Sequence, residues 1–378
     1  MQNAESLQFT LQLSALSESS LFISPHRLIL KTCGTTLNLL GLPRILQIAS
    51  TQANLPSVYR CFYSRKSFMF PERQLGPHRD WKHEVEYLDN IFQNGAAYTV
   101  GKFNGDHWLL YMTTPDQGFN CCGREPAPSS PISLKLEDGF SHAQDYTIEI
   151  LMSDLSPSAR QSFFSLSTSA DSSVTPSSHA QAVSATVGIS NIFPPHLTTL
   201  DAYTFSPCGY SSNALIKWGN DATITSTAKS IGIETSVAMP HTREGYYTIH
   251  VTPEEGWSYA SFECNIPLPI TSHPPLSHPS QNPDLKSVIQ RVVDIFQPGR
   301  LSLTLFIQSK DNELEEGASA VEAAQRAFRE ALTPPSQVAV RGNGPPNESG
   351  SRLYKRTNKI NYEFWGYDLA FASFELRV

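Results

Sequence analysis

The sequence predicts an α+β fold that is rich in strands. A helix is predicted to begin after Asp284, which can cap it, because apolar residues recur at helical spacing over 285–296. An earlier helix is predicted over 82–92. Strand-like runs follow the two helices, over 97–112 with an Asn-Gly turn and over 301–308. Between the predicted insertions, a strand-rich pattern thus alternates with helices.

The two predicted helices end in similar sequences. The first ends in Ile91-Phe92-Gln93-Asn94-Gly95, and the second ends in Ile295-Phe296-Gln297-Pro298-Gly299. Each ending is followed by a strand-like run. The similarity is a faint internal repeat, for which chance is the alternative explanation.

Length and composition limit the class of protein. The chain has 378 residues, 40% hydrophobic and 17% charged, which is enough for a sizeable core. The net charge of −7 is spread along the chain, so no nucleic-acid partner is expected. Six cysteines without a CxxC pair indicate neither a metal site nor a redox motif. No apolar run approaches the ~20 residues of a membrane span, and no signal peptide is recognised, so a cytosolic protein is expected.

Four stretches are predicted to be loop insertions in a single domain that spans 1–378. They are poor in apolar residues or rich in Pro, Gly and Ser, and they cover 115–133, 153–190, 267–283 and 311–350. Within the last of them, 318–332 has a helical composition that ends at Pro334-Pro335.

The first candidate for chemistry is the run Leu16-Ser17-Glu18-Ser19-Ser20. Two short apolar stretches follow it on either side of a turn signal, Ser24 to Arg27. A hairpin centred on His26 is predicted to place Ser19 opposite Cys33. A hydroxyl and a thiol would then lie together at the open end of the hairpin, although a serine in a polar turn is the common alternative.

Several ordered blocks resemble eukaryotic S-adenosylmethionine decarboxylase, a pyruvoyl-dependent enzyme of polyamine synthesis. Beside the run at 16–20, they are Lys31-Thr32-Cys33-Gly34-Thr35-Thr36, Tyr63-Ser64-Arg65-Lys66-Ser67-Phe68-Met69, Pro77-His78-Arg79-Asp80-Trp81, Phe205 to Asn213, Tyr247 to Glu254 and Ser258 to Glu263. The resemblance implies a duplicated αββα sandwich of two antiparallel sheets flanked by helices.

The resemblance also implies a self-cleaving proenzyme. Cleavage between Glu18 and Ser19 would give a β chain of 1–18 and an α chain of 19–378, with Ser19 converted to a pyruvoyl group. That group would form a Schiff base with S-adenosyl-L-methionine and assist its decarboxylation to S-adenosylmethioninamine, the aminopropyl donor for spermidine and spermine. Neither a metal nor PLP is expected.

Three further residues are identified as catalytic by resemblance. Cys33 would return a proton to the substrate carbon, Ser211 would assist the acyl shift, and His250 would remove the proton for ester elimination. Strand alternation predicts that His250 shares a face with Thr248 and Thr252. For each residue the alternative is structural: a buried thiol, a loop serine or a hydrogen-bonded core histidine.

Substrate contacts are likewise implied by the resemblance. Glu254 would accept hydrogen bonds from the ribose hydroxyls, Phe205 would stack on adenine, and Leu16 would line the substrate site. A core phenylalanine and a solvent-facing glutamate are the alternatives.

Two departures from the family pattern modify these expectations. Lys31 and Glu263 match part of the site at which putrescine activates many members, but 181–187 carries no acid, so putrescine activation is not expected. The family also has several dozen residues before its cleavage site, including an aromatic that contacts adenine, and 1–14 does not match them. The chain as given is therefore expected to be a poor decarboxylase.

Two classes of function follow from the sequence. The leading hypothesis is the decarboxylase, with its own cleaved β chain as partner and with a homodimer compatible with the resemblance. The rival is a non-catalytic paralogue that binds and regulates an active decarboxylase subunit.

Overall fold

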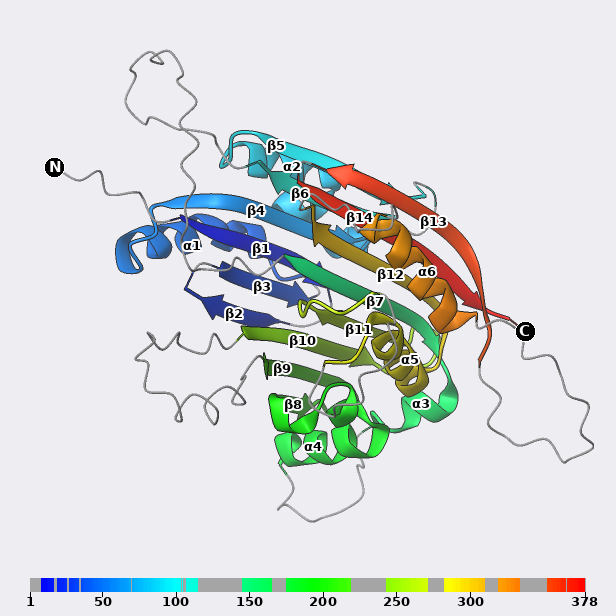
Figure 1. Ribbon diagram of the computed structural model, residues 1–378. Helices are drawn as coiled ribbons and strands as arrows, with labels where there is room; N and C mark the ends of the chain where they lie inside the picture. Colours follow the sequence, from blue (N-terminus) through cyan, green and yellow to red (C-terminus); the bar gives the residue numbers. More distant parts are fainter. Residues whose placement is uncertain are drawn as a thin grey trace, which may run out of the picture. The chain divides into compact units, whose positions relative to one another are not determined.

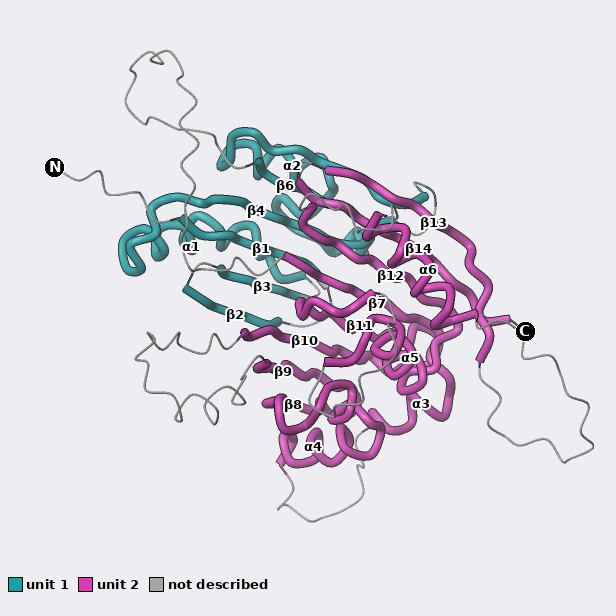
Figure 2. Tube along the Cα trace, in the orientation of Figure 1, with its two compact units in different colours: residues 1–143 teal, residues 144–378 magenta. Residues whose placement is uncertain are grey.

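The computed structural model describes residues 8–16, 19–25, 27–33, 35–68, 70–102, 104, 107–114, 145–164, 175–218, 243–270, 282–309, 319–333, 352–364 and 366–377. The side chains of Leu16 and Cys33 are not described. The predicted insertion at 115–133, and Glu18, lie outside these residues. The chain divides into two compact units, 1–143 and 144–378, which Figure 2 colours separately. The predicted single domain stays a prediction.

Unit 1 contains a six-stranded sheet in the order β2-β3-β1-β4-β6-β5 (Figure 1). Strand β1 runs parallel to both of its neighbours, and the other pairs are antiparallel. Its elements are β1 (Gln8–Leu16), β2 (Ser20–Ser24), β3 (Arg27–Cys33), α1 (Asn38–Gln52), β4 (Ser57–Lys66), η1 (Pro71–Arg73), η2 (Gly76–Arg79), α2 (Trp81–Asp89), β5 (Gly95–Gly101) and β6 (His107–Thr113).

Unit 2 contains an eight-stranded antiparallel sheet in the order β13-β14-β12-β7-β11-β10-β9-β8. Its strands are β7 (Tyr146–Leu155), β8 (Thr198–Thr204), β9 (Tyr210–Trp218), β10 (Arg243–Thr252), β11 (Tyr259–Cys264), β12 (Pro298–Gln308), β13 (Tyr354–Phe364) and β14 (Tyr367–Leu376). Its helices are α3 (Pro157–Gln161), α4 (Pro176–Val187), η3 (Ile189–Asn191), η4 (Pro195–Leu197), α5 (Leu285–Phe296) and α6 (Ala320–Leu332).

Each sheet buries one face against helices. In unit 1, Leu11 and Leu13 of β1 pack with Leu39 and Leu42 of α1 and with Leu88 of α2. In unit 2, alternate residues of the central strands join apolar side chains of α4, α5 and α6 in one larger core. Two sheets, each with its own helical layer, confirm the predicted α+β fold.

Local signals account for the elements that the sequence predicted best. Helix α5 begins at Leu285, where the Asp284 carboxylate accepts a hydrogen bond from the Ser287 amide at 2.7 Å. Strands β5 and β6 follow α2 and flank the predicted Asn-Gly turn. Helix α6 lies within the segment of predicted helical composition.

The predicted insertion over 153–190 is wrong in its described part. Strand β7 continues to Leu155, and α3, α4 and η3 follow in the remainder. The reason is burial: Ala180 and Val183 of α4 and Ile189 of η3 belong to the core of unit 2. A serine-rich composition concealed this short apolar face.

The predicted register of the first hairpin is also wrong. Strands β2 and β3 pair Ser24 with Arg27 and Ser20 with Lys31, so the register extended by one residue places Ser19 opposite Thr32. Two residues, Pro25 and His26, connect the strands, and a two-residue connection shifts the pairing by one position. Cys33 is instead paired with Leu16 of β1.

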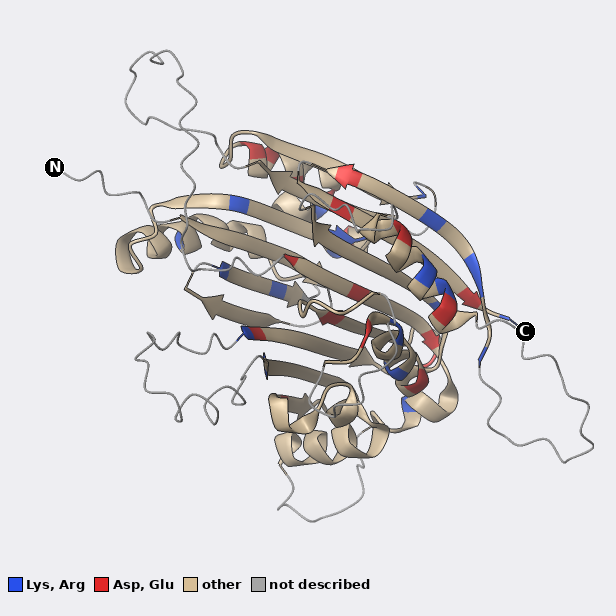
Figure 3. Cartoon of the chain, in the orientation of Figure 1, with Lys and Arg blue, Asp and Glu red and all other residues tan. Residues whose placement is uncertain are grey.

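Charged side chains of both signs are interspersed over the described elements (Figure 3). No helix among the described residues is long and apolar enough to cross a membrane.

Candidate active site

Ser211 and His250 form the clearest catalytic arrangement in unit 2. They are register partners on β9 and β10, and the Ser211 hydroxyl lies 3.0 Å from the His250 Nδ1 atom. His250 is 1% exposed. Its strand neighbours Ile249 and Val251 point into the helix-covered core, so the predicted alternation is confirmed. The Ser211 hydroxyl is half-buried, and a serine hydroxyl bonded to an imidazole can exchange a proton with it.

Phe205 directly follows β8 and precedes β9, the strand that carries Ser211. Its ring is 37% exposed and lies 5.2 Å from that of Tyr203, measured between centroids. The turn that follows contains a cis Ser206–Pro207 bond and closes with a hydrogen bond from the Phe205 amide to the Gly209 carbonyl. Gly209 has a φ of 116°, which favours glycine, and a Cβ at this position would lie 3.5 Å from the Phe205 side chain. The turn thus presents an aromatic face to its surroundings.

Glu254 follows β10 and is half-buried. Burial raises the pKa of the Cys208 thiol, and the nearby Glu254 carboxylate, to which the thiol hydrogen-bonds, raises it further. The guanidinium of Arg160 donates to the Pro253 carbonyl at 3.4 Å, so α3 supports the same loop. The neighbouring Glu255 is exposed.

Glu263 lies on β11 with a second acid beside it that the sequence analysis missed. Its register partner on β7 is Glu149, and the two residues are only 4% and 7% exposed. Tyr246 donates a hydrogen bond to Glu263 at 2.8 Å. Glu149 stands between Ile148 and Ile150 in an apolar strand, and an acid in that pattern is the signal that could have revealed it.

In unit 1, the predicted residues gather where β1 and β3 end. Ser19 is exposed and directly precedes β2, whereas Lys31 of β3 is fully buried. Leu16 and Cys33 are the paired last residues of β1 and β3. The structure therefore brings these backbone positions together, with the one-residue correction for Ser19.

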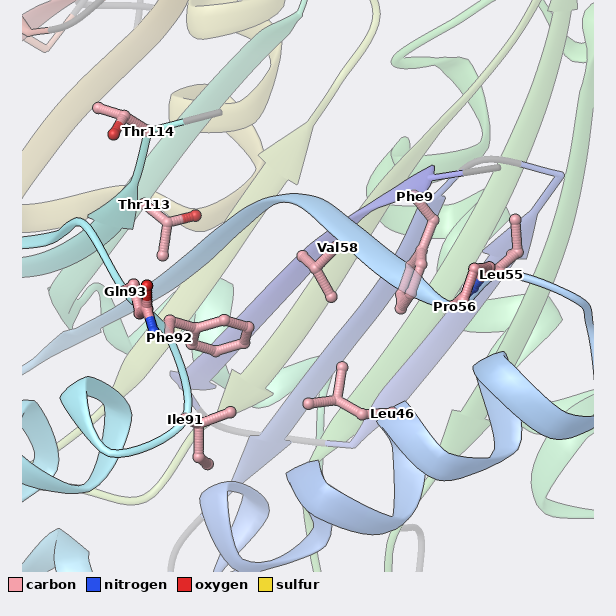
Figure 4. Close-up of a pocket in the computed structure, with 10 residues that line it drawn as sticks. All are labelled: Phe9, Leu46, Leu55, Pro56, Val58, Ile91, Phe92, Gln93, Thr113 and Thr114. Atoms are coloured by element: carbon pink, nitrogen blue, oxygen red, sulfur yellow. The ribbon is translucent and has the colours of Figure 1, made fainter. Parts of the chain in front are cut away.

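A cavity of about 310 Å³ lies elsewhere in unit 1 (Figure 4). Phe9, Leu46, Leu55 and Phe92 are among the apolar side chains that line it. None of the predicted site residues lines this cavity.

Comparisons with known proteins agree with these motifs. The model of the family described as adenosylmethionine decarboxylase matches residues 10–375. A protein from Xenopus laevis named "S-adenosylmethionine decarboxylase proenzyme" is 36% identical over 83% of this chain and 74% of its own length. One of the same name from Saccharomyces cerevisiae is 32% identical over 82% of this chain and 72% of its own.

A solved structure supports the fold. A Trypanosoma brucei protein described as an AdoMetDC-delta26 monomer has a TM-score of 0.55 with this chain at 20% identity, covering 95% of this chain and all of the other. At that identity the likeness concerns the fold alone.

Proposed function

Because the chain belongs to the adenosylmethionine decarboxylase family, whose members are carboxy-lyases, we propose that it decarboxylates S-adenosyl-L-methionine. The product is S-adenosylmethioninamine, the aminopropyl donor for spermidine and spermine. The observation that carries the proposal is the hydrogen bond of 3.0 Å between the Ser211 hydroxyl and His250, the two residues predicted to act in processing.

Self-cleavage between Glu18 and Ser19 would create the reactive end of the α chain, 19–378. Ser19 is exposed and directly precedes β2. The pyruvoyl group derived from Ser19 would supply the electron sink for decarboxylation, as a Schiff base with the substrate amine. The first 18 residues would remain as the β chain.

Ser211 and His250 are proposed to act as a pair in this processing. The serine hydroxyl assists the acyl shift from the Glu18 carbonyl to the Ser19 oxygen. The imidazole then removes the α-proton of residue 19, and elimination releases the Glu18 carboxylate. Burial of His250 keeps water from competing for its proton.

Phe205, Glu254 and Leu16 are proposed to bind the substrate. The exposed ring of Phe205 offers a stacking face for adenine, and the Glu254 carboxylate can accept hydrogen bonds from two ribose hydroxyls. Cys33, the last residue of β3, is proposed to protonate the substrate carbon after carbon dioxide leaves.

Glu263 and Lys31 are proposed as residues of a putrescine site, and we add Glu149 to them. The expectation that putrescine does not activate rested on the lack of an acid in 181–187. Those residues lie in helix α4, whereas Glu149 is the strand neighbour of Glu263. Two buried carboxylates side by side repel when both are ionised, and a bound diamine offsets that repulsion. This pair therefore supports activation by putrescine.

A non-catalytic paralogue that regulates an active subunit remains the rival. Such a paralogue would need residues that bind its partner subunit, but it would not need two residues that assist self-cleavage. The Ser211–His250 arrangement therefore favours the enzyme. We place its action in the cytosol, as the low cysteine content suggests.

The experiment is a processing and activity assay of the full chain with and without Ser19→Ala. Denaturing electrophoresis and mass spectrometry should reveal a large chain that begins with a blocked pyruvoyl group, and carboxyl-labelled substrate should release carbon dioxide. Ser19→Ala should stay uncleaved, because no hydroxyl remains to attack. An uncleaved wild-type chain after prolonged incubation would refute the proposal.

A further inference from the structure

A buried polar cluster in unit 1 has no role in the reaction described above. Its centre is the carboxylate of Glu84 in α2, which is fully buried. Arg65 of β4 donates from Nε to both carboxylate oxygens, at 2.7 and 3.0 Å. The Tyr63 hydroxyl donates at 2.6 Å, and His78 Nδ1 lies 2.8 Å from the same carboxylate. We call these four residues the Glu84 cluster.

The hydrogen atoms of the cluster can be assigned from its partners. The amide of Leu39 in α1 donates to His78 Nε2 at 3.4 Å, so Nε2 accepts and Nδ1 carries the hydrogen that it donates to Glu84. Burial and the negative charge of Glu84 raise the pKa of Tyr63, so its hydroxyl keeps its proton and donates it. Glu84 thus accepts from three different side chains, and its one charge is matched by that of Arg65.

The register places this cluster beside the ends of β1 and β3. Arg65 is paired with Ala15 of β1, and Ala15 is paired with Thr32 of β3. The next residues of β1 and β3 are Leu16 and Cys33. The row that contains Arg65 is therefore directly followed by the row of Leu16 and Cys33, the proposed proton donor.

Helix α1 provides a second connection. It begins at Asn38, five residues after Cys33, and His78 Nε2 accepts a hydrogen bond from the Leu39 amide in its first turn. The Asn38 side chain donates to the Ser14 carbonyl of β1 at 3.2 Å. The cluster thus contacts the helix that fixes both the end of β1 and the exit of β3.

Stability alone is a poor explanation for such a cluster. Burying an ion pair costs solvation energy, and apolar residues of similar volume are often at least as stabilising. What a fully hydrogen-bonded network provides is one fixed geometry, because each donor and acceptor constrains the others.

We propose that the Glu84 cluster is a positioning device that aligns the ends of β1 and β3 for self-cleavage at Ser19 and for proton transfer by Cys33. The four residues lie on the face of the unit 1 sheet that the helices cover. They are positioning residues, because they hold the strands in place and do not contact the reacting atoms. The inference rests on the proposed function above, and it names residues that the reaction itself does not use.

Tyr111 offers a matched control within the same sheet. It is the register partner of Tyr63 on the neighbouring strand β6, it is also fully buried, and its hydroxyl donates to Asp89 of α2 at 2.9 Å. Tyr63→Phe and Tyr111→Phe each remove one hydroxyl that donates to a carboxylate of the same helix. Only the first of them disturbs the Glu84 cluster.

The test measures thermal unfolding and the rate of self-cleavage for both variants. The two substitutions should lower the melting temperature by similar amounts. Tyr63→Phe should slow cleavage by about tenfold or more, because small misplacements of reacting groups have large effects on rate, and Tyr111→Phe should cleave at the wild-type rate. Equal cleavage rates in the two variants would overturn the inference, whether both are slow or both are normal.

Hydrogen exchange separates this inference from the proposed function. In a Ser19→Ala background, in which all chains are uncleaved, Tyr63→Phe should speed amide exchange at the ends of β1 and β3 and in the first turn of α1, and Tyr111→Phe should not. A wild-type chain that never cleaves refutes the proposed function, and the exchange comparison then decides the positioning role alone. Exchange that is the same in both variants at these amides would refute that role.

Discussion

At the scale of single residues, the hydrogen bond between Ser211 and His250 is the most informative contact. Adjacent strands in register bring together two side chains that are 39 positions apart in sequence. Sequence blocks identify the two residues by resemblance, but only the pairing of β9 and β10 brings them into contact.

His250→Ala should stop processing after the acyl shift. The ester between Glu18 and the Ser19 oxygen would accumulate, because no imidazole removes the α-proton. Hydroxylamine, which cleaves esters, should then release two chains that mass spectrometry can identify. His196→Ala is the control, because His196 is exposed in η4. A His250→Ala chain that cleaves at the wild-type rate would contradict the role.

Glu254→Gln should make the Cys208 thiol more reactive. Burial raises the pKa of this thiol most, and the Glu254 carboxylate raises it further. Loss of the carboxylate charge should therefore lower the pKa of the thiol and increase the thiolate fraction at a fixed pH of ~8. Alkylation of the Cys208 peptide, followed by mass spectrometry, should become several-fold faster. Glu255→Gln should leave the rate unchanged because that exposed carboxylate has no part in the shift. An unchanged alkylation rate in Glu254→Gln would show that the Glu254 carboxylate does not raise the pKa of the Cys208 thiol.

At the scale of elements, caps and apolar faces determine where helices begin and how they pack. Helix α5 has both signals: Asp284 caps it, and Val288, Ile289, Val292 and Phe296 are fully buried on one face. The local signals for helix α1 are weaker, because Gly41 and Pro43 lie inside it and no side chain caps its first turn. Burial of Leu39 and Leu42 stabilises it nevertheless.

Asp284→Ala should lower the free energy of unfolding by about 0.5–2 kcal/mol, because the first-turn amide of Ser287 loses its acceptor. Urea denaturation followed by circular dichroism measures the change. Asp284→Asn keeps an oxygen acceptor, so it should lower the free energy of unfolding much less than Asp284→Ala does. Equal losses in the two variants would show that the cap does not stabilise α5.

At the scale of the whole molecule, each unit has its own sheet, helices and core. The predicted single domain requires that the two units unfold together. Leu13 and Ile249, which are fully buried in the cores of unit 1 and unit 2, can test this requirement.

Leu13→Ala and Ile249→Ala should each lower the midpoint of one common unfolding transition. Each deletion leaves a cavity that costs about 2–5 kcal/mol. Urea titrations monitored by fluorescence and by circular dichroism should coincide in both variants. Leu215→Ala, at a position that is 49% exposed, is the control and should change stability little. Two separate transitions, each shifted by one variant only, would show two domains.

Much of the candidate site follows from sequence motifs. Ser19, Cys33, Ser211, His250 and Glu254 stand in blocks that resemble the family, and the family is confirmed by the match over residues 10–375. The same blocks could not reveal Glu149, because it lies in a different segment from Glu263 and only strand pairing makes them neighbours. The Glu84 cluster was missed for the same reason, since its members come from β4, η2 and α2.

The sequence by itself determined the elements with strong local signals: the capped helix α5, the strands around the Asn-Gly turn, and the motifs that identify the chemistry. These signals depend on residues within one or two turns of each other. Only the tertiary structure decided the hairpin register that moves Ser19 from Cys33 to Thr32, and the helix α1 that forms despite Pro43. Register and burial depend on contacts between distant segments, whose energies no local pattern contains.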